Sequence, residues 1–168
     1  MQDLKQFVVD IPDFPQPGIL FRDISPLLRR HFAATIDSIE RLFSEAEWDA
    51  VDAVAGIESR GFILASALAE RRGKGFVPIR KKGKLPPPVV DIAYDLEYGT
   101  GVLEMQAGQG RLLLVDDVLA TGGTLAASMV LSRQAGYVVQ GIGVLIDIGI
   151  APGFRCEHHV PRIVLQYG

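Results

Sequence analysis

The chain has 168 residues, a length typical of one domain, and a net charge of −3, which excludes a general attraction to nucleic acid or to an anionic membrane. Apolar residues make up 48% and charged residues 22% of the chain, which excludes a disordered polymer and provides enough material for a core. The single cysteine excludes an internal disulfide. The first ten residues do not resemble a signal peptide, so we expect a cytoplasmic protein without a membrane span.

The N-terminal 35 residues are expected to be extended and irregular. Pro12, Pro15 and Pro17 lie close together and Gly18 follows them. Proline fixes its own backbone and restricts the residue before it, which disfavours a helix here. Apolar residues then recur every three to four positions, which predicts an amphipathic helix over residues 34–47.

Strands and helices are expected to alternate after this helix. Short apolar runs predict buried strands, and helical periodicity predicts the segments between them. The predicted elements are a strand over 50–57, a helix over 59–72, and strands over 75–81 and 111–117, then a helix over 123–136 and a strand over 138–146. This order predicts an α/β domain with a mainly parallel central sheet flanked by helices.

Residues 81–106 have a different character, with three consecutive prolines and several glycines. We interpret this segment as a long excursion from the domain, in the form of a loosely ordered hairpin. A long insertion in a compact domain is usually a functional lid or a disordered loop.

The segment LLLVDDVLATGGTL, residues 112–125, has the strongest functional pattern. Asp116 and Asp117 end an apolar strand, and ligands of open α/β sheets bind at the carboxyl ends of strands. The turn that follows leads into a helix, so its backbone N–H groups and hydroxyls can surround one phosphate. This phosphate cradle consists of Ala120, Thr121, Gly122, Gly123 and Thr124.

A ribose 5-phosphate satisfies both parts of this pattern, because its phosphate fits the turn and its hydroxyls donate to the carboxylates. The lysine of a P-loop is absent and no G-x-G-x-x-G occurs, which disfavours ATP hydrolysis and NAD binding. The simpler alternatives are a strand end closed by acidic turn residues and a helix N-cap made by Thr121 or Thr124.

The same segment resembles the phosphoribosyl pyrophosphate signature of type I phosphoribosyltransferases. Five more stretches resemble the adenine phosphoribosyltransferases in the same order, namely PDFPQPGILFRDISPLL, AGIESRGF, IRKKGKLP, YDLEYG and LEMQ. The resemblance implies a single phosphoribosyltransferase domain over residues 1–168. Its hood would span roughly 1–33 plus 147–168, and its flexible lid loop roughly 81–105.

The resemblance also implies an activity, that of a pentosyltransferase of purine salvage. Phosphoribosyl pyrophosphate and adenine would give AMP and pyrophosphate through an oxocarbenium-like transition state. Mg²⁺ would be held mainly by pyrophosphate and not by a fixed protein ligand, with Asp116 able to contact it through water. The implied assembly is a homodimer that binds neither nucleic acid nor a membrane.

Residue roles follow from the matching positions. Asp116 and Asp117 would contact the ribose, and Arg60 with Ser59 would bind pyrophosphate after a non-proline cis peptide at Glu58–Ser59. The catalytic set would be Glu97, Asp116, Asp117 and Arg60. Further pyrophosphate contacts would come from Arg80, Lys81 and Lys84, the lid tip from Glu97 and Tyr98, and the adenine contacts from Leu20, Phe21 and Arg22.

Purely structural or solvent-exposed roles remain open for several of these residues. The basic residues between 71 and 84 also suit a solvated surface, and Arg60 suits a surface helix position. Glu97 and Tyr98 could simply be an exposed acid and a loop anchor, and the apolar residues around Phe21 could fill a core.

Two alternative functions remain open as well. One is transfer to another purine base, and the other is a regulator that senses phosphoribosyl pyrophosphate without catalysis. The resemblance favours adenine, because it implies that the backbone C=O of Leu20 and N–H of Arg22 match its amino group and N1, whereas a 6-oxopurine reverses that pattern.

Overall fold

The structure is a computed structural model that describes residues 3–96 and 99–168. By its internal contacts the chain forms two compact units, Met1–Ser38 and Ile39–Gly168. Each unit is described by itself. No helix in the described ranges is both long and apolar enough to cross a membrane.

The N-terminal unit is more regular than the sequence predicted, and the expectation of 35 irregular residues is wrong. It contains a 3-10 helix, η1 (Leu4–Phe7), and an antiparallel pair of strands, β1 (Val9–Pro12) and β2 (Leu20–Asp23). The prolines do not prevent this pairing, because Pro12 ends β1 and the other two lie in the connection between the strands, where no ladder hydrogen bond is needed.

Helix α1 (Ser25–Glu40) begins well before the predicted start at residue 34. The carboxylate of Asp23 accepts hydrogen bonds from the N–H and the hydroxyl of Ser25, at 2.9 and 2.6 Å. Pro26 follows in the first turn, where its missing N–H costs no helical bond. A capping box of Ser44 and Glu47 starts a separate helix, α2 (Glu45–Asp49), so the single helix predicted over 34–47 is in fact two.

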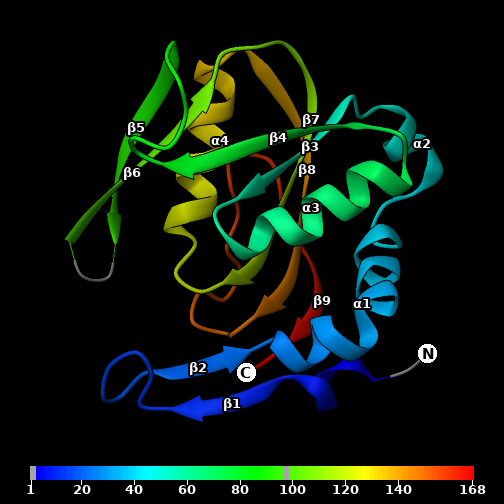
Figure 1. Ribbon diagram of the computed structural model, residues 1–168, viewed down its shortest axis with the longest axis vertical. Coiled ribbons are helices and arrows are strands. Elements are labelled where there is room, and N and C mark those ends of the chain that lie inside the picture. Colours follow the sequence, from blue (N-terminus) through cyan, green and yellow to red (C-terminus); the bar gives the residue numbers. More distant parts are fainter. Residues whose placement is uncertain (1–2, 97–98) are drawn as a thin grey trace. The chain divides into compact units, whose positions relative to one another are not determined.

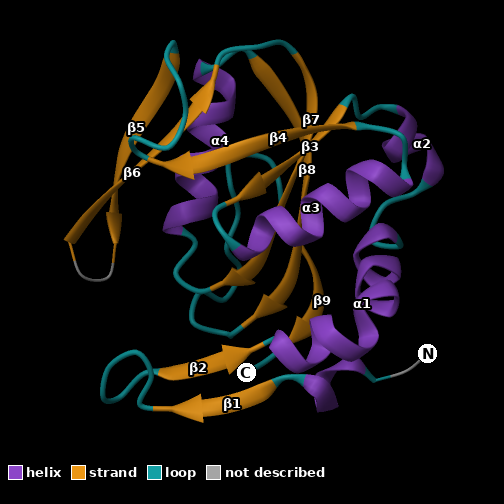
Figure 2. Ribbon diagram, in the orientation of Figure 1, coloured by secondary structure: helices purple, strands orange, loops and turns teal. Residues whose placement is uncertain are grey.

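The C-terminal unit is built on a seven-stranded sheet with helices packed against it (Figure 2). The strand order is β5-β6-β4-β3-β7-β8-β9 (Figure 1). Neighbours from β4 to β9 pair in parallel, which confirms the predicted mainly parallel sheet, and β5 and β6 form an antiparallel edge. The strands are β3 (Ala53–Ile57), β4 (Gly75–Lys81), β5 (Val89–Leu96), β6 (Gly99–Gln106), β7 (Gly110–Leu119), β8 (Tyr137–Asp147) and β9 (Arg162–Gln166).

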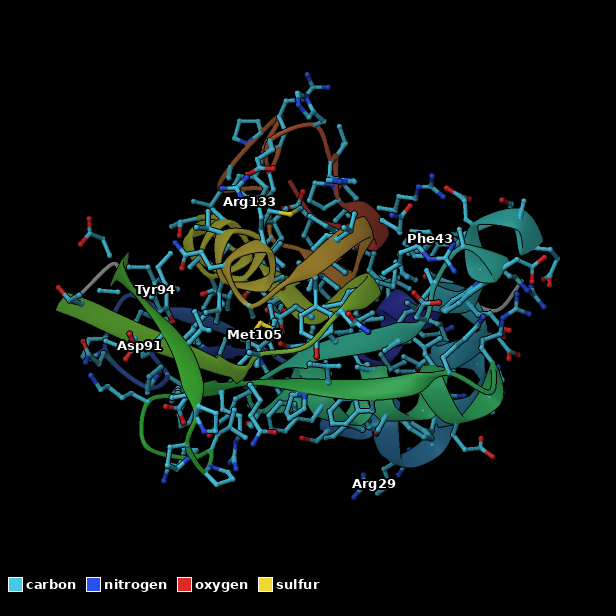
Figure 3. The ribbon with its side chains drawn as sticks, turned by 90° about the horizontal axis from the view of Figure 1, so that it is seen from above. Arg29, Phe43, Asp91, Tyr94, Met105 and Arg133 are labelled. Carbon is cyan, nitrogen blue, oxygen red and sulfur yellow. The ribbon has the colours of Figure 1, made fainter. Side chains whose placement is uncertain are left out.

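Two helices cover opposite faces of this sheet, α3 (Arg60–Arg71) and α4 (Gly123–Gln134). The crossover from β3 through α3 to β4 and the crossover from β7 through α4 to β8 run in opposite directions along the sheet. Because such crossovers are right-handed, their helices must lie on different faces. Figure 3, seen from above, shows α4 above the strands and α3 below them.

Residues 81–106 form a regular hairpin in their described part, and the expectation of a loosely ordered excursion is wrong there. Strands β5 and β6 pair along their full length, and β6 also pairs with β4 through Arg80 and Lys81. Leu103 and Met105 of β6 belong to the buried core cluster beneath α4, and Tyr94 of β5 packs against it (Figure 3). The apolar residues of this stretch therefore extend the sheet.

Candidate active site

Two helices begin at the same edge of the sheet. Strands β3 and β7 are parallel neighbours, and helices α3 and α4 start just after their carboxyl ends. The N-cap residues are Ser59 and Gly122, and neither helix has a side-chain cap. The alternative of a helix N-cap made by Thr121 or Thr124 is therefore wrong. Helix N-termini concentrate N–H groups and positive potential, so this edge favours an anion.

Asp116 and Asp117 lie at this edge with only 7% and 8% of their surface exposed. The N–H of Asp117 donates to Oδ1 of Asp116 at 2.9 Å. Burial, together with the neighbouring charge of Asp117, raises the pKa of the Asp116 carboxyl well above its usual value. The sequence prediction of two acids beside the turn is matched in position, and both are withdrawn from solvent.

Arg60 and Asp117 are brought together by α3 and β7. The Nε atom of Arg60 lies 2.6 Å from Oδ2 of Asp117, and the arginine side chain is 31% exposed. A Cβ atom at Gly61 would lie 2.9 Å from Oδ1 of Asp116 and 3.1 Å from the carbonyl oxygen of Val115. Glycine at position 61 therefore allows the start of α3 to approach the end of β7 closely enough for this ion pair.

The phosphate cradle surrounds a small cavity of about 60 Å³ lined by residues 118–125. Gly122 has a φ of 87°, which favours glycine, and a Cβ atom there would lie 2.1 Å from the ring of Phe154. Gly123 lies against the end of β5, since its Cβ would be 3.3 Å from the carbonyl oxygen of Asp95. All five residues predicted for the cradle are thus in one turn, with its backbone exposed to a cavity.

The peptide bond between Glu58 and Ser59 is cis, as predicted. Oε2 of Glu58 accepts hydrogen bonds from Nε of Arg80 at 3.2 Å and from the N–H of Lys81 at 3.0 Å. Burial opposes ionisation of Glu58, but these two bonds lower the pKa of its carboxyl below the usual value. Arg80 is therefore partly neutralised by Glu58, whereas the sequence suggested either a pyrophosphate contact or a solvated surface position.

Two residues near the site were missed in the sequence. Glu104 of β6 is 3% exposed and accepts three backbone hydrogen bonds from residues 83–85. Phe154 covers Gly122 from the segment after β8. An acid between two apolar residues, in LEMQ, was the available signal for Glu104, and no local pattern indicated Phe154.

The residues predicted to bind adenine belong to the N-terminal unit. Leu20, Phe21 and Arg22 lie in β2 of the N-terminal unit, where the Phe21 ring packs edge-on against Phe14 at 5.1 Å between centroids. Arg22 forms an ion pair with Asp10. Glu97 and Tyr98 lie outside the described residues.

The chain is similar in sequence to known phosphoribosyltransferases. Residues 28–153 match the phosphoribosyl transferase domain family. The chain is 50% identical over 165 residues to an adenine phosphoribosyltransferase of Hydrogenovibrio crunogenus, covering 98% of this chain and 96% of the relative. It is 52% identical over 146 residues to that of Bdellovibrio bacteriovorus, covering 87% and 88%.

Solved structures give the same result. The adenine phosphoribosyltransferase of Rhodothermus marinus is 43% identical with a TM-score of 0.84, covering 97% of this chain and 96% of that one. The enzyme of Saccharomyces cerevisiae, solved with adenine and an imino-altritol bisphosphate, is 33% identical with a TM-score of 0.88 and covers 96% of each chain.

Proposed function

The chain belongs to the phosphoribosyltransferase family, among its adenine phosphoribosyltransferases, and we propose from this premise that it transfers a 5-phosphoribosyl group to adenine. The reaction consumes phosphoribosyl pyrophosphate and adenine and gives AMP and pyrophosphate, so the chain is a pentosyltransferase of purine salvage. The buried pair Asp116 and Asp117 beside the uncapped turn of α4 is the observation that carries this proposal.

The sugar half of the proposed site uses β7 and α4. The 5′-phosphate binds the backbone N–H groups of the phosphate cradle, and the ribose hydroxyls donate to Asp116 and Asp117. Positive charge develops on the ribose as pyrophosphate leaves, and two carboxylates in a buried setting stabilise that charge more strongly than they would in water.

The pyrophosphate half uses the start of α3 and the end of β4. Arg60 can donate its remaining guanidinium N–H groups to pyrophosphate while Nε stays beside Asp117. Ser59 contributes from the uncapped N-terminus of α3, and Arg80, Lys81 and Lys84 add positive charge. Together these groups gather the charge of the leaving group.

We propose Mg²⁺ as the cation of the reaction. The two carboxylates fit a hard cation that is shared with substrate phosphates, which is how Mg²⁺ usually binds. Asp116 would contact it through water, and pyrophosphate oxygens would supply the other ligands. When bound, the cation neutralises charge on the leaving pyrophosphate.

The base half follows the family resemblance. The C=O of Leu20 accepts from the 6-amino group of adenine, the N–H of Arg22 donates to N1, and Phe21 stacks on the ring. Glu97 acts as general acid/base for the ring proton that adenine loses, and Tyr98, the next residue in the sequence, is assigned to the lid with it by the same resemblance. The lid loop (roughly 81–105), the hood (roughly 1–33 plus 147–168), a homodimeric assembly and a cytoplasmic location complete the proposal.

A base-competition assay tests this function. The protein is incubated with phosphoribosyl pyrophosphate, Mg²⁺ and an equimolar mixture of adenine and hypoxanthine, and AMP, IMP and pyrophosphate are quantified. We expect AMP and pyrophosphate in equal amounts, with little IMP. A preference for hypoxanthine would indicate another purine base, and binding of phosphoribosyl pyrophosphate without any nucleotide product would indicate a regulator.

A further inference from the structure

The residues between the end of β4 and the first proline of the hairpin form a turn held from two sides. This lysine turn consists of residues 80–85. On one side, Oε1 of Glu104 accepts from the N–H groups of Lys84 and Leu85, each at 2.7 Å, and its Oε2 accepts from that of Gly83 at 3.0 Å. Burial opposes ionisation of Glu104, but the three N–H bonds lower its pKa below the usual value. The carboxylate is therefore charged at neutral pH.

The other side of the lysine turn is held by Glu58. Its Oε2 accepts from the N–H of Lys81 at 3.0 Å, and Nη1 of Arg80 donates to the carbonyl oxygen of Lys84 at 3.3 Å. These bonds fix the backbone on both sides of Lys82. None of them uses a lysine ammonium group.

The ammonium groups of two lysines in this turn are left available. Lys82 pairs with Asp91 at 3.4 Å, whereas neither Lys81 nor Lys84 has an ion pair within residues 3–96 and 99–168. Both residues are exposed. The turn thus holds its backbone rigidly while it presents two unpaired cations.

We propose that Glu104 is a positioning residue for pyrophosphate, acting through the lysine turn without touching the substrate. The inference rests on the proposed function, because it assigns Lys81 and Lys84 to the pyrophosphate of that reaction. Flexible lysines bind a multivalent anion better when the backbone that carries them is already ordered, since less freedom is lost on binding.

The direction in which Glu104→Gln changes pyrophosphate affinity distinguishes a positioning role from a direct effect of charge. Glu104 is negative, so its neutralisation should by charge alone strengthen the binding of an anion. If Glu104 positions the turn, Glu104→Gln should instead weaken binding, because glutamine has one acceptor oxygen for three N–H groups and points an NH₂ group at one of them.

Asp91 provides the matched control. It is the cross-strand partner of Glu104 in the pairing of β5 with β6, and within residues 3–96 and 99–168 its carboxylate pairs only with the side chain of Lys82. Asp91→Asn therefore removes one negative charge from the same place without removing a backbone hydrogen bond.

The experiment measures binding of magnesium pyrophosphate to the wild-type, Glu104→Gln and Asp91→Asn proteins by calorimetry. We expect about tenfold weaker binding for Glu104→Gln, a factor typical of lost positioning contacts, and unchanged or slightly tighter binding for Asp91→Asn. The KM for phosphoribosyl pyrophosphate should rise in Glu104→Gln while that for adenine stays the same. Amide hydrogen exchange at residues 83–85 should accelerate in the free variant.

Each outcome decides one question. Unchanged or tighter pyrophosphate binding in Glu104→Gln, or an equal rise in both KM values, overturns the positioning role. If the wild type forms no AMP while Glu104→Gln still loses pyrophosphate affinity, the proposed function fails and the positioning role stands. If Glu104→Gln does not fold, Glu58→Gln tests the same turn from its other side, and unchanged pyrophosphate binding there overturns the proposal.

Discussion

Arg60 and Asp117 form an ion pair with 2.6 Å between Nε and Oδ2, which joins the start of α3 to the end of β7. The two residues were predicted to bind different parts of one substrate, pyrophosphate and ribose. Their contact places the cation proposed for the leaving group beside the carboxylate proposed for the sugar. The bond that breaks in the proposed reaction joins those two parts, so this pair is suited to act on both sides of it.

Replacement of Asp117 by asparagine tests the ribose role. We expect kcat to fall by about 10²-fold or more, because a buried charge next to the reacting sugar is lost. Stability should change little, since Asp117→Asn also removes repulsion with Asp116 and leaves Arg60 partly solvated. AMP formation and thermal unfolding measure the two effects.

Asp52→Asn is the matched control for this variant. Asp52 pairs with Arg111 at the amino ends of β3 and β7, the opposite edge of the sheet from Asp117, with 2.9 Å between Nη2 and Oδ1. Turnover should match that of the wild type. Equal kcat in Asp117→Asn and the wild type would refute a role in the reaction.

Asp116→Asn should stabilise the protein at neutral pH while it lowers turnover. The folded-state pKa of Asp116 is raised, so the folded state binds a proton more tightly than the unfolded chain does. Stability from this group is present at low pH and is lost as pH rises from the usual carboxyl pKa through the raised value. Asparagine removes that loss. We therefore expect the free energy of unfolding at pH 7 to rise by on the order of 1 kcal/mol, which corresponds to about 2–4 °C in Tm.

Urea unfolding of wild type and Asp116→Asn across pH 4–8 measures this effect. The stability difference should grow as pH rises and shrink toward pH 4. A difference that is constant over this range would mean that the carboxyl is not the titrating group.

Glu97→Gln tests the lid. We expect the single-turnover rate of AMP formation to fall by about 10²-fold with unchanged affinity for phosphoribosyl pyrophosphate, since a general acid/base acts on the purine and not on the sugar. Asp95→Asn, an acid on the same hairpin, is the control and should keep its single-turnover rate. An unaltered rate in Glu97→Gln would make Glu97 a loop residue without a chemical role.

Local patterns predicted the central part of the fold well. Strand β4 occupies Gly75–Lys81, as predicted, and α4 starts at Gly123, because apolar runs and a glycine turn are encoded in neighbouring residues. The pairing of β1 with β2 was missed, since proline-rich sequence around it masks a pairing between separated residues. Strand β9 was also missed for want of a local signal.

In the site, too, residues that are close in sequence were predicted, and contacts between distant residues were not. Asp116, Asp117 and the phosphate cradle form one continuous stretch, so sequence alone brought them together. The sequence marks Glu104 as an acid between two apolar residues but does not indicate its role, because its partners are backbone N–H groups about twenty positions earlier and no side-chain pattern encodes a backbone partner. The ring of Phe154 against Gly122 likewise depends on the folded chain.

Gly122→Ala should destabilise the protein and weaken phosphate binding. A side chain at φ 87° costs about 1–2 kcal/mol, and the clash with the Phe154 ring at 2.1 Å adds about 1–3 kcal/mol. Urea unfolding measures the total. Affinity for inorganic phosphate or AMP should fall as well, because the turn must move to relieve the clash.

Gly153→Ala separates the two costs. Gly153 has a φ of 72°, but a Cβ atom there would meet nothing within 4 Å, so only the backbone cost applies. We expect Gly153→Ala to lose about 1–2 kcal/mol and to bind AMP normally. The difference between the two variants is the contribution of the Phe154 ring, and Phe154→Ala combined with Gly122→Ala should recover that part. Equal losses in both single variants would show that the ring yields without cost and that the cradle does not depend on it.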